Sequence, residues 1–171
     1  TAAGANVFLY GGRDVTLNAG NIKGGTGGVV TLTGTAGKVN EAGAGVITAS
    51  SLQANAGTTV TLNLAGNNVG TVAGKSAGTF TYKDADTVDI GAVTATDAIN
   101  TTAGDGTGKT ATNGITTTGA AIAVTTVSAT GDLTLSKDVD TTNAGGTAAG
   151  ANVFLYGGRD VTLNAGNIKG G

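Results

Sequence analysis

Acid–base or metal chemistry in this sequence would have to rest mainly on carboxylates, because the chain contains no His and no Cys. A Ser-His-Asp or Cys-His nucleophile is therefore excluded, as is a zinc site of the usual kind. The acidic candidates are Asp84, Asp86 and Asp89. Asp84 and Asp86 share strand parity, so both could lie on one outer face, where paired carboxylates could act on a sugar. Because no His and no aromatic groove accompany them and Lys83 lies beside them, we expect solvated residues near a corner and no catalytic residue.

Two acidic segments also have the oxygen ligands that calcium prefers. They are the Asp84–Asp89 cluster and Asp105-Gly106-Thr107-Gly108, and neither matches the Gly-Gly-x-Gly-x-Asp repeat or the EF-hand spacing. Phosphate loops are not expected either, because Gly11-Gly12-Arg13-Asp14 precedes no helix and Gly24–Gly28 precedes a predicted strand. The sequence therefore predicts no metal site and no cofactor.

The composition narrows the possible partners. Of 171 residues, 32 are Gly and 32 are Thr, charged residues make up 12%, and the net charge is −2. Without a basic stripe, nucleic acid is not an expected partner. The apolar fraction of 39% argues against disorder. The uncharged stretch Thr110–Thr130 is too rich in Thr, Asn and Gly for the bilayer core, so no membrane span is expected.

The elements that must position any site are short strands. An apolar-Thr-apolar unit recurs at Val15–Leu17, Val30–Leu32, Val60–Leu62, Phe80–Tyr82 and Leu133–Leu135, usually after a Gly- or Asp-containing turn. This alternation is typical of a strand with one buried face. We expect Val15, Leu17, Val60 and Leu62 to face the core and the Thr residues to point outward. No window has apolar residues at helical spacing, and the chain has no Pro that would interrupt a ladder.

A long exact repeat decides the architecture. Residues 1–25 and residues 147–171 are identical, at an offset of 146. We interpret residues 1–146 as one full solenoid period and residues 147–171 as the start of the next, within a longer chain. At roughly 20 residues a turn, a period would hold about seven turns and rise about 34 Å. Thr147 should then occupy the place of Thr1 after that translation and a modest twist.

Two features leave alternatives open. Phe8 and Tyr10 share one strand parity and Val7 and Leu9 the other, so one apolar pair must face outward. An exposed Phe8 and Tyr10 pair could form an edge or lateral contact, and core packing of these rings at a corner is the alternative. Thr-x-Thr pairs suggest an ice-binding face as a remote alternative, but their irregular spacing favours ordinary cross-strand pairing. These pairs are Thr31/Thr33/Thr35, Thr79/Thr81, Thr94/Thr96 and Thr116/Thr118.

Several segments together resemble the repeats of filamentous-hemagglutinin-like exoproteins of Gram-negative bacteria. They are GVVTLTGTAGKV (Gly28–Val39), GVITASSLQANA (Gly45–Ala56), VTLNLAGNNVGTVAG (Val60–Gly74) and FTYKDADTVDIGAV (Phe80–Val93). The resemblance covers most of the period and weakens between Asp97 and Val124. It implies a right-handed parallel β-helix, export to the cell surface, and a role as a surface fibre, an adhesin or a stalk for a toxin.

The sequence thus predicts an all-β, right-handed parallel β-solenoid that forms a continuous segment of an extracellular or cell-surface fibre. Its expected partners are further repeats of the same chain, other fibres through lateral bundling, and a host or neighbouring cell surface. The alternative is the stalk of an adhesin or toxin-delivery exoprotein whose binding tip lies outside this segment. An enzymatic role is not expected.

Overall fold

The computed structural model describes residues 4–94, 111–143 and 146–171, and within them the chain forms eighteen short strands and no helix. Accordingly, none of these residues belongs to a helix long and apolar enough to cross a membrane. Gly and Thr at this density disfavour helix, whereas the β-branched residues between them suit a pleated, half-buried surface.

Sixteen of these strands form two parallel sheets, which together make the wall of a coil. The six-stranded sheet contains β2 (Val15–Leu17), β4 (Val39–Glu41), β6 (Val60–Leu62), β8 (Phe80–Asp84), β13 (Ile122–Thr126) and β16 (Val153–Tyr156). The ten-stranded sheet contains β1 (Val7–Gly11), β3 (Ile22–Gly34), β5 (Ile47–Ala56), β7 (Asn68–Ser76), β9 (Val88–Ile90), β12 (Ile115–Thr117), β14 (Leu133–Leu135), β15 (Val139–Asp140), β17 (Val161–Leu163) and β18 (Ile168–Lys169). The remaining strands, β10 (Ala92–Thr94) and β11 (Ala111–Asn113), pair with each other antiparallel.

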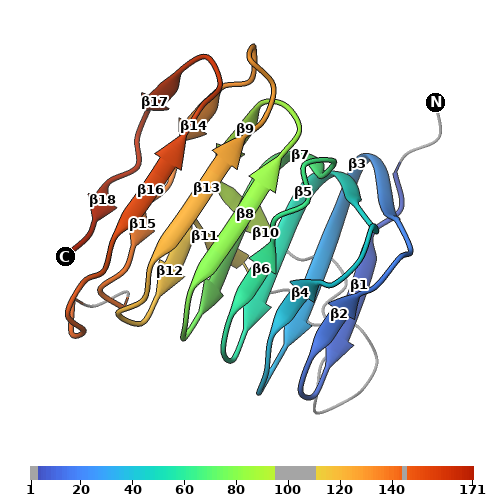
Figure 1. The fold of residues 1–171 in the computed structure, drawn as a ribbon, viewed down its shortest axis with the longest axis horizontal. Coiled ribbons are helices and arrows are strands. Elements are labelled where there is room, and N and C mark those ends of the chain that lie inside the picture. Colours follow the sequence, from blue (N-terminus) through green and yellow to red (C-terminus); the bar gives the residue numbers. More distant parts are fainter. Residues whose placement is uncertain (1–3, 95–110, 144–145) are drawn as a thin grey trace.

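The chain passes from one sheet to the other once in every turn and stacks each turn on the one before. It rises through the front sheet, returns behind it and advances toward the C-terminal end, so the coil is right-handed (Figure 1). Hydrogen bonds between successive turns join residues 23, 24, 25 and 20 positions apart in the first turns. The expected parallel β-solenoid architecture is therefore confirmed.

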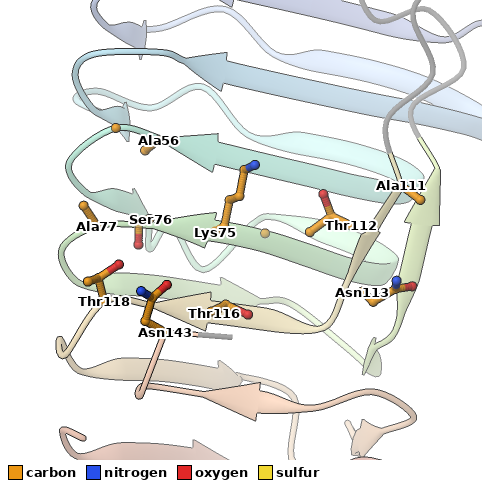
Figure 2. Close-up of a pocket in the computed structure, with 12 residues that line it drawn as sticks. Ala56, Lys75, Ser76, Ala77, Ala111, Thr112, Asn113, Thr116, Thr118 and Asn143 are labelled. Carbon is orange, nitrogen blue, oxygen red and sulfur yellow. The ribbon is translucent and has the colours of Figure 1, made fainter. Parts of the chain in front are cut away.

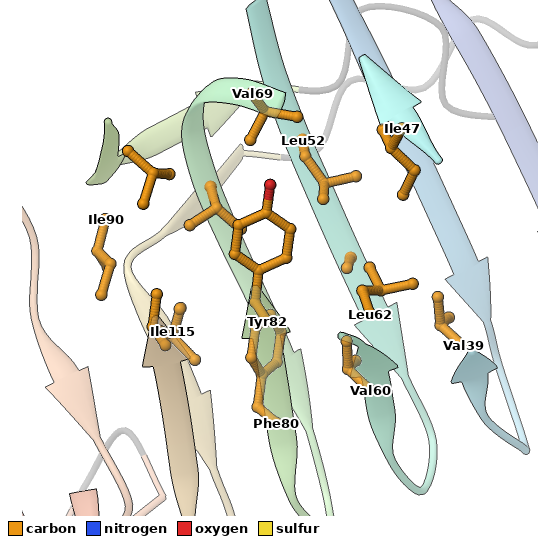
Figure 3. Close-up of a cluster of buried hydrophobic side chains, with 14 of the residues drawn as sticks. Val39, Ile47, Leu52, Val60, Leu62, Val69, Phe80, Tyr82, Ile90 and Ile115 are labelled. Atoms are coloured by element: carbon orange, nitrogen blue, oxygen red, sulfur yellow. The ribbon is translucent and has the colours of Figure 1, made fainter. Parts of the chain in front are cut away.

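The core consists of columns of inward side chains, one from each turn. One column of the six-stranded sheet contains Val15, Val39, Val60, Phe80, Ile122 and Val153. Figure 3 shows how residues from the opposite wall, among them Leu52 and Ile90, pack toward this sheet. Val60 and Leu62 are fully buried, and Val15 and Leu17 are 8% and 6% exposed, so all four predicted core residues are confirmed.

Small residues make room for the bulkiest side chain of a column. Gly74 lies in an inward position of β7, in register with Ala54 and Ile115. A Cβ atom on Gly74 would lie 2.4 Å from Cε2 of Phe80, which is far closer than a van der Waals contact. At this position the narrow core accepts an aromatic ring because the facing residue carries no side chain.

One turn is lengthened by residues that leave the wall. The hydrogen bond from the backbone N–H of Asp132 to Thr87 Oγ1 joins adjacent turns across 45 residues, about twice the separation seen earlier. The additional chain includes the hairpin of β10 and β11, which lies against β5 and β7. Because the pairing of β12 with β7 resumes in register after it, the hairpin does not interrupt the coil.

The number of turns and the placement of the two identical segments differ from our prediction. Five pairing steps lead from β1 to β15, so one 146-residue period makes between five and six turns, and not seven. Val7 pairs with Val30 in the ten-stranded sheet, whereas its counterpart Val153 pairs with Ile122 in the six-stranded sheet. A translation with a modest twist therefore does not superpose the two copies. The residues that leave the wall lengthen the chain without completing turns.

The choice between the two apolar pairs of the repeated segment is now resolved. Val7 and Leu9 lie in register with the buried Val30 and Leu32, so they point inward. The rings of Phe8 and Tyr10 stack on the outer surface, with centroids 6.4 Å apart and an interplanar angle of 18°. In the second copy, Phe154 and Tyr156 are 57% and 52% exposed. The same parity is therefore kept on both sheets.

Substitutions on β6 test the assignment of inner and outer faces. Leu62→Asp should abolish cooperative unfolding, because it buries a charge with no partner. Leu62→Ala should cost about 2–5 kcal/mol of unfolding free energy. Thr61→Lys, one position away on the outer face, should change it by less than about 0.5 kcal/mol. Urea unfolding followed by circular dichroism measures all three, and equal losses at positions 61 and 62 would show that the assignment is wrong.

Candidate functional site

The acidic residues singled out in the sequence do not gather at one surface. Asp84 is fully buried inside the coil, whereas Asp86 is exposed at the corner that follows β8. Our expectation of solvated residues near a corner is wrong for Asp84, which continues the inward parity of Phe80 and Tyr82, and the two carboxylates do not share an outer face. Asp89, in β9, accepts a hydrogen bond of 3.2 Å from the backbone N–H of Ser136 in the next turn. These carboxylates therefore do not form a pair that could act on a sugar.

The metal and ice-binding candidates are also dispersed. Among the described residues, no three acidic side chains come close enough to hold a metal ion. Asp105-Gly106-Thr107-Gly108 lies outside those residues, as does Thr96. Of the Thr-x-Thr residues, Thr31 is only 4% exposed, and Thr81 lies on the other sheet from Thr31 and Thr116. The pairs therefore do not share one flat exposed face.

Two buried carboxylates instead bind backbone and side-chain groups at one corner of the coil. Asp84 accepts hydrogen bonds from the hydroxyl of Tyr82 and, at 2.9 Å, from the backbone N–H of Val69. Glu41 accepts bonds of 3.0 Å from the N–H of Leu64 and 3.1 Å from the amide of Asn67. These carboxylates therefore satisfy N–H groups that the strand ladders leave unpaired.

Burial governs the electrostatics of this corner. It raises the pKa of Glu41 above its ordinary value, although the hydrogen bonds from Leu64 and Asn67 act in the opposite direction. Burial likewise raises the pKa of Asp84, and it raises that of Tyr82 well above its ordinary value, with the nearby Asp84 carboxylate as the next cause. Oε1 of Glu41 is buried without a hydrogen-bond partner, so the charged form of this side chain is costly to keep.

A groove of about 500 Å³ lies on the outer side of the ten-stranded sheet. Its floor comes from β7 and β12, and β11 forms one wall (Figure 2). Its lining is mostly hydroxyl, amide and small side chains, with Lys75 as the single charged residue among those described. A neighbouring hollow of about 240 Å³ shares Lys75 and includes Asn55, whose Oδ1 atom is buried without a partner.

The chemistry of this groove is hydrogen bonding with one positive charge. Thr112 in β11 accepts a 2.6 Å hydrogen bond from the amide of Gln53, which fixes the hairpin against the wall. Thr116 and Thr118 present hydroxyl groups from β12 and the turn after it, and Asn143 lies at the same end. The described lining residues include no carboxylate and no aromatic ring, so the groove has neither an acid–base pair nor a platform for stacking a sugar.

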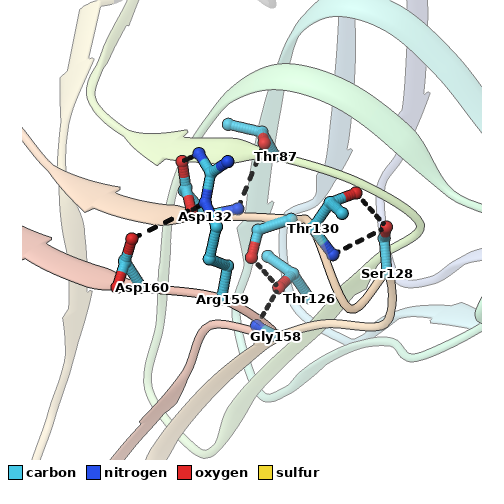
Figure 4. A network of polar contacts seen from close by, with 9 residues as sticks. Thr87, Thr126, Ser128, Thr130, Asp132, Gly158, Arg159 and Asp160 are labelled. Carbon is cyan, nitrogen blue, oxygen red and sulfur yellow. Dashed lines mark hydrogen bonds and ion pairs between the residues drawn. The ribbon is translucent and has the colours of Figure 1, made fainter.

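A polar network ties the repeated segment to the turn below it. The guanidinium of Arg159 donates two hydrogen bonds to the Asp132 carboxylate, at 2.8 Å from Nε and a shorter one from Nη2 (Figure 4). This hydrogen bonding lowers the pKa of Asp132 and raises that of Arg159. The backbone N–H of Asp132 donates to Thr87 Oγ1 at 3.1 Å, one further turn away, and this hydrogen bond fixes the position of Asp132.

The inward placement of Glu41 and Asp84 was missed in the sequence, although the pattern contained a signal for both. Glu41 stands where the last apolar residue of an apolar-x-apolar unit is expected, after Val39 and Asn40. Asp84 falls on the inward parity two residues after Tyr82. A polar residue at an inward strand position, next to a corner with unpaired N–H groups, therefore indicates a buried cap.

The raised pKa of Glu41 predicts a definite pH dependence. Because the folded state holds the proton more tightly, the stability from this group is present below its unfolded pKa, near 4.5, and is lost as pH rises through the folded pKa. The urea midpoint of the unsubstituted chain should therefore rise relative to that of Glu41→Gln as the pH falls from neutral toward 4.5. A difference in urea midpoint between the two proteins that stays constant across this pH range would contradict the prediction.

Asp138→Asn is the matched control, because its effect has the opposite sign. Hydrogen bonding from the N–H of Asn167, together with Lys169, lowers the pKa of Asp138 below its ordinary value of 3.8. Stability from Asp138 is therefore present above that value and lost as pH falls through the folded pKa. The unsubstituted chain should lose stability relative to this variant only in strong acid.

Comparison with known proteins found no match to the chain among family models, curated proteins or solved structures. The residues themselves and their arrangement in the coil are therefore the grounds for a functional proposal.

Proposed function

We propose that this chain is a structural segment of a secreted or cell-surface β-solenoid fibre built from tandem 146-residue repeats. The observation that carries the proposal is that one sequence of 25 residues supplies strands to both the first and the last turns of a single unbroken coil. A segment that can take both positions can also follow itself along a chain. Its function would then come from length, stiffness and repetition.

The contacts between turns support a mechanical role. Every strand of the two sheets pairs in parallel with a strand of an adjacent turn, so backbone hydrogen bonds run along the coil axis. The corners add bonds in the same direction, for example from the N–H of Lys38 to Asp14 Oδ1 at 2.9 Å. A pull along the axis is thus resisted by many parallel bonds in each turn.

The open end of the coil supports continuation by stacking. Val161, Leu163 and Ile168 are 42%, 55% and 43% exposed, although they lie in register with fully buried residues of the preceding turn. A further turn of similar sequence would cover them. Burying such side chains is worth about 1.5–3 kcal/mol each when complete.

The outer groove favours a second candidate, the stalk of an adhesin or toxin-delivery exoprotein. Because the wall requires only inward apolar columns, it can carry a hairpin on its outer surface. The hairpin of β10 and β11 borders a groove that contains Lys75. In this case the segment would hold other parts of the protein away from the surface, and its partners would include a host or neighbouring cell. Both candidates share the same coil.

Filament measurements test the structural proposal. X-ray diffraction from oriented native filaments should show a reflection near 4.8 Å along the long axis, from the spacing of stacked strands. The intact native polypeptide should have a mass several times the 16.2 kDa of this segment. Thr61→Lys should leave filaments intact and Leu62→Asp should prevent them. A native chain with a single copy of the period would contradict the proposal.

A further inference from the structure

The two identical segments lie on different sides of the coil. VFLY is a strand of the ten-stranded sheet in the first copy and of the six-stranded sheet in the second. The coil has three sides, because the ten-stranded sheet covers two of them, one with β9, β14 and β17 and the other with β12, β15 and β18. VTL is displaced in the same sense as VFLY, since Val15 pairs within the six-stranded sheet and Val161 on the β9–β14 side of the ten-stranded sheet. One period therefore ends one side further round the coil than it began.

Either side can accept this segment because the inner columns are chemically alike. Val7 lies in register with Val30 on one sheet, and Val153 with Ile122 on the other. Both partners are fully buried aliphatic residues. The outward side chains also find neutral neighbours in both places, because Phe8 is in register with Thr31 and Phe154 with Ala123. Nothing in the strand itself selects one sheet.

The second copy shows how the segment binds the turn below it. Arg159 binds the Asp132 carboxylate, as described above. The backbone N–H and side-chain amide of Asn167 donate to Asp138 Oδ1 at 3.0 and 3.2 Å, and Lys169 Nζ lies 3.0 Å from Asp138 Oδ2. These downward contacts use N–H donors of the repeated segment.

The first copy shows how the same segment binds the turn above it. Three side-chain oxygens, one at each corner, accept backbone N–H groups one turn further on. Asn6 Oδ1 accepts from Val29 at 2.9 Å, Asp14 Oδ1 from Lys38 at 2.9 Å, and Asn21 Oδ1 from Val46 at 3.0 Å. These upward contacts use acceptor atoms of the segment.

The upward and downward contacts do not compete for atoms. Asn21 uses its amide oxygen upward, whereas its counterpart Asn167 uses its N–H groups downward. Asp14 accepts an N–H of the upper turn through Oδ1. Arg159, which is the second-copy equivalent of the neighbouring Arg13, donates to the lower turn. A single copy can therefore make both sets of contacts at once, whichever side of the coil it occupies.

We propose that consecutive repeats are related by a screw in which each repeat is rotated by one side of the coil, about a third of a turn, and rises about 25 Å. This inference rests on the proposed tandem fibre. Under this screw, the β10–β11 hairpin and its groove lie on the ten-stranded sheet in this repeat and on the sheet that continues β16 in the next repeat. The fibre presents the groove on each of its sides in succession.

Cysteine pairs test the rotation in the chain as it stands, which has no native Cys. Ala123 and Phe154 are register partners on adjacent parallel strands, as are Thr125 and Tyr156. Their Cα spacing of about 4.8 Å suits a disulfide. Each double Cys variant should lose both free thiols on mild oxidation, measured by mass spectrometry after alkylation.

The contrasting pair is Asp140→Cys with Tyr156→Cys. Asp140 ends the outward column that begins at Tyr10, so Tyr156 would face it if the second copy had returned to the sheet of the first. This variant should keep both thiols. Oxidation of this pair, or failure of both in-register pairs in chains with unchanged circular dichroism, would overturn the one-side advance.

Electron cryomicroscopy of native filaments then tests the screw itself. The expected helical symmetry is a rotation of about a third of a turn with each rise of about 25 Å. A repeat of that rise without rotation would overturn the screw while leaving the tandem fibre supported. Particles without any axial repeat would overturn both proposals.

Discussion

Backbone hydrogen bonding between successive turns is the constraint on which the rest of this structure depends. Each strand must lie in register with the one before it, because an unpaired N–H or C=O group in the wall has no other partner. Extra residues can therefore be added only where they leave the wall, as β10 and β11 do. Given that register, inward side chains form columns and outward ones form ladders, and the core follows from the pairing.

Corners are where this constraint becomes costly, since the ladders end there and N–H groups remain unpaired. Asn6, Asp14 and Asn21 meet that need from the surface, where their own polar groups stay partly hydrated. Glu41 and Asp84 meet it from inside, where burial raises their pKa values. Burial fixes the geometry of these two carboxylates, but it also makes the stability of the fold depend on pH.

The outer surface is comparatively free. Its ladders hold Thr and Asn, as where Thr16 Oγ1 donates to Asn40 Oδ1 at 2.8 Å, but also the stacked rings of Phe8 and Tyr10. The hairpin that walls the groove adds outer surface without changing a single inward column. A coil of this kind can thus vary what it displays on the outside while keeping the same wall.

The sequence by itself determined the class of fold and the inner face of the apolar-Thr-apolar strands, because alternation of side chains is a local property of the chain. Val60 and Leu62 could be assigned to the core for that reason. Phe8 and Tyr10 could not be distinguished from Val7 and Leu9, since both pairs are apolar and only register with Val30 and Leu32 decides between them. The side of the coil on which each copy lies was decided only by the tertiary structure, because it depends on how many residues every corner and hairpin removes from the wall.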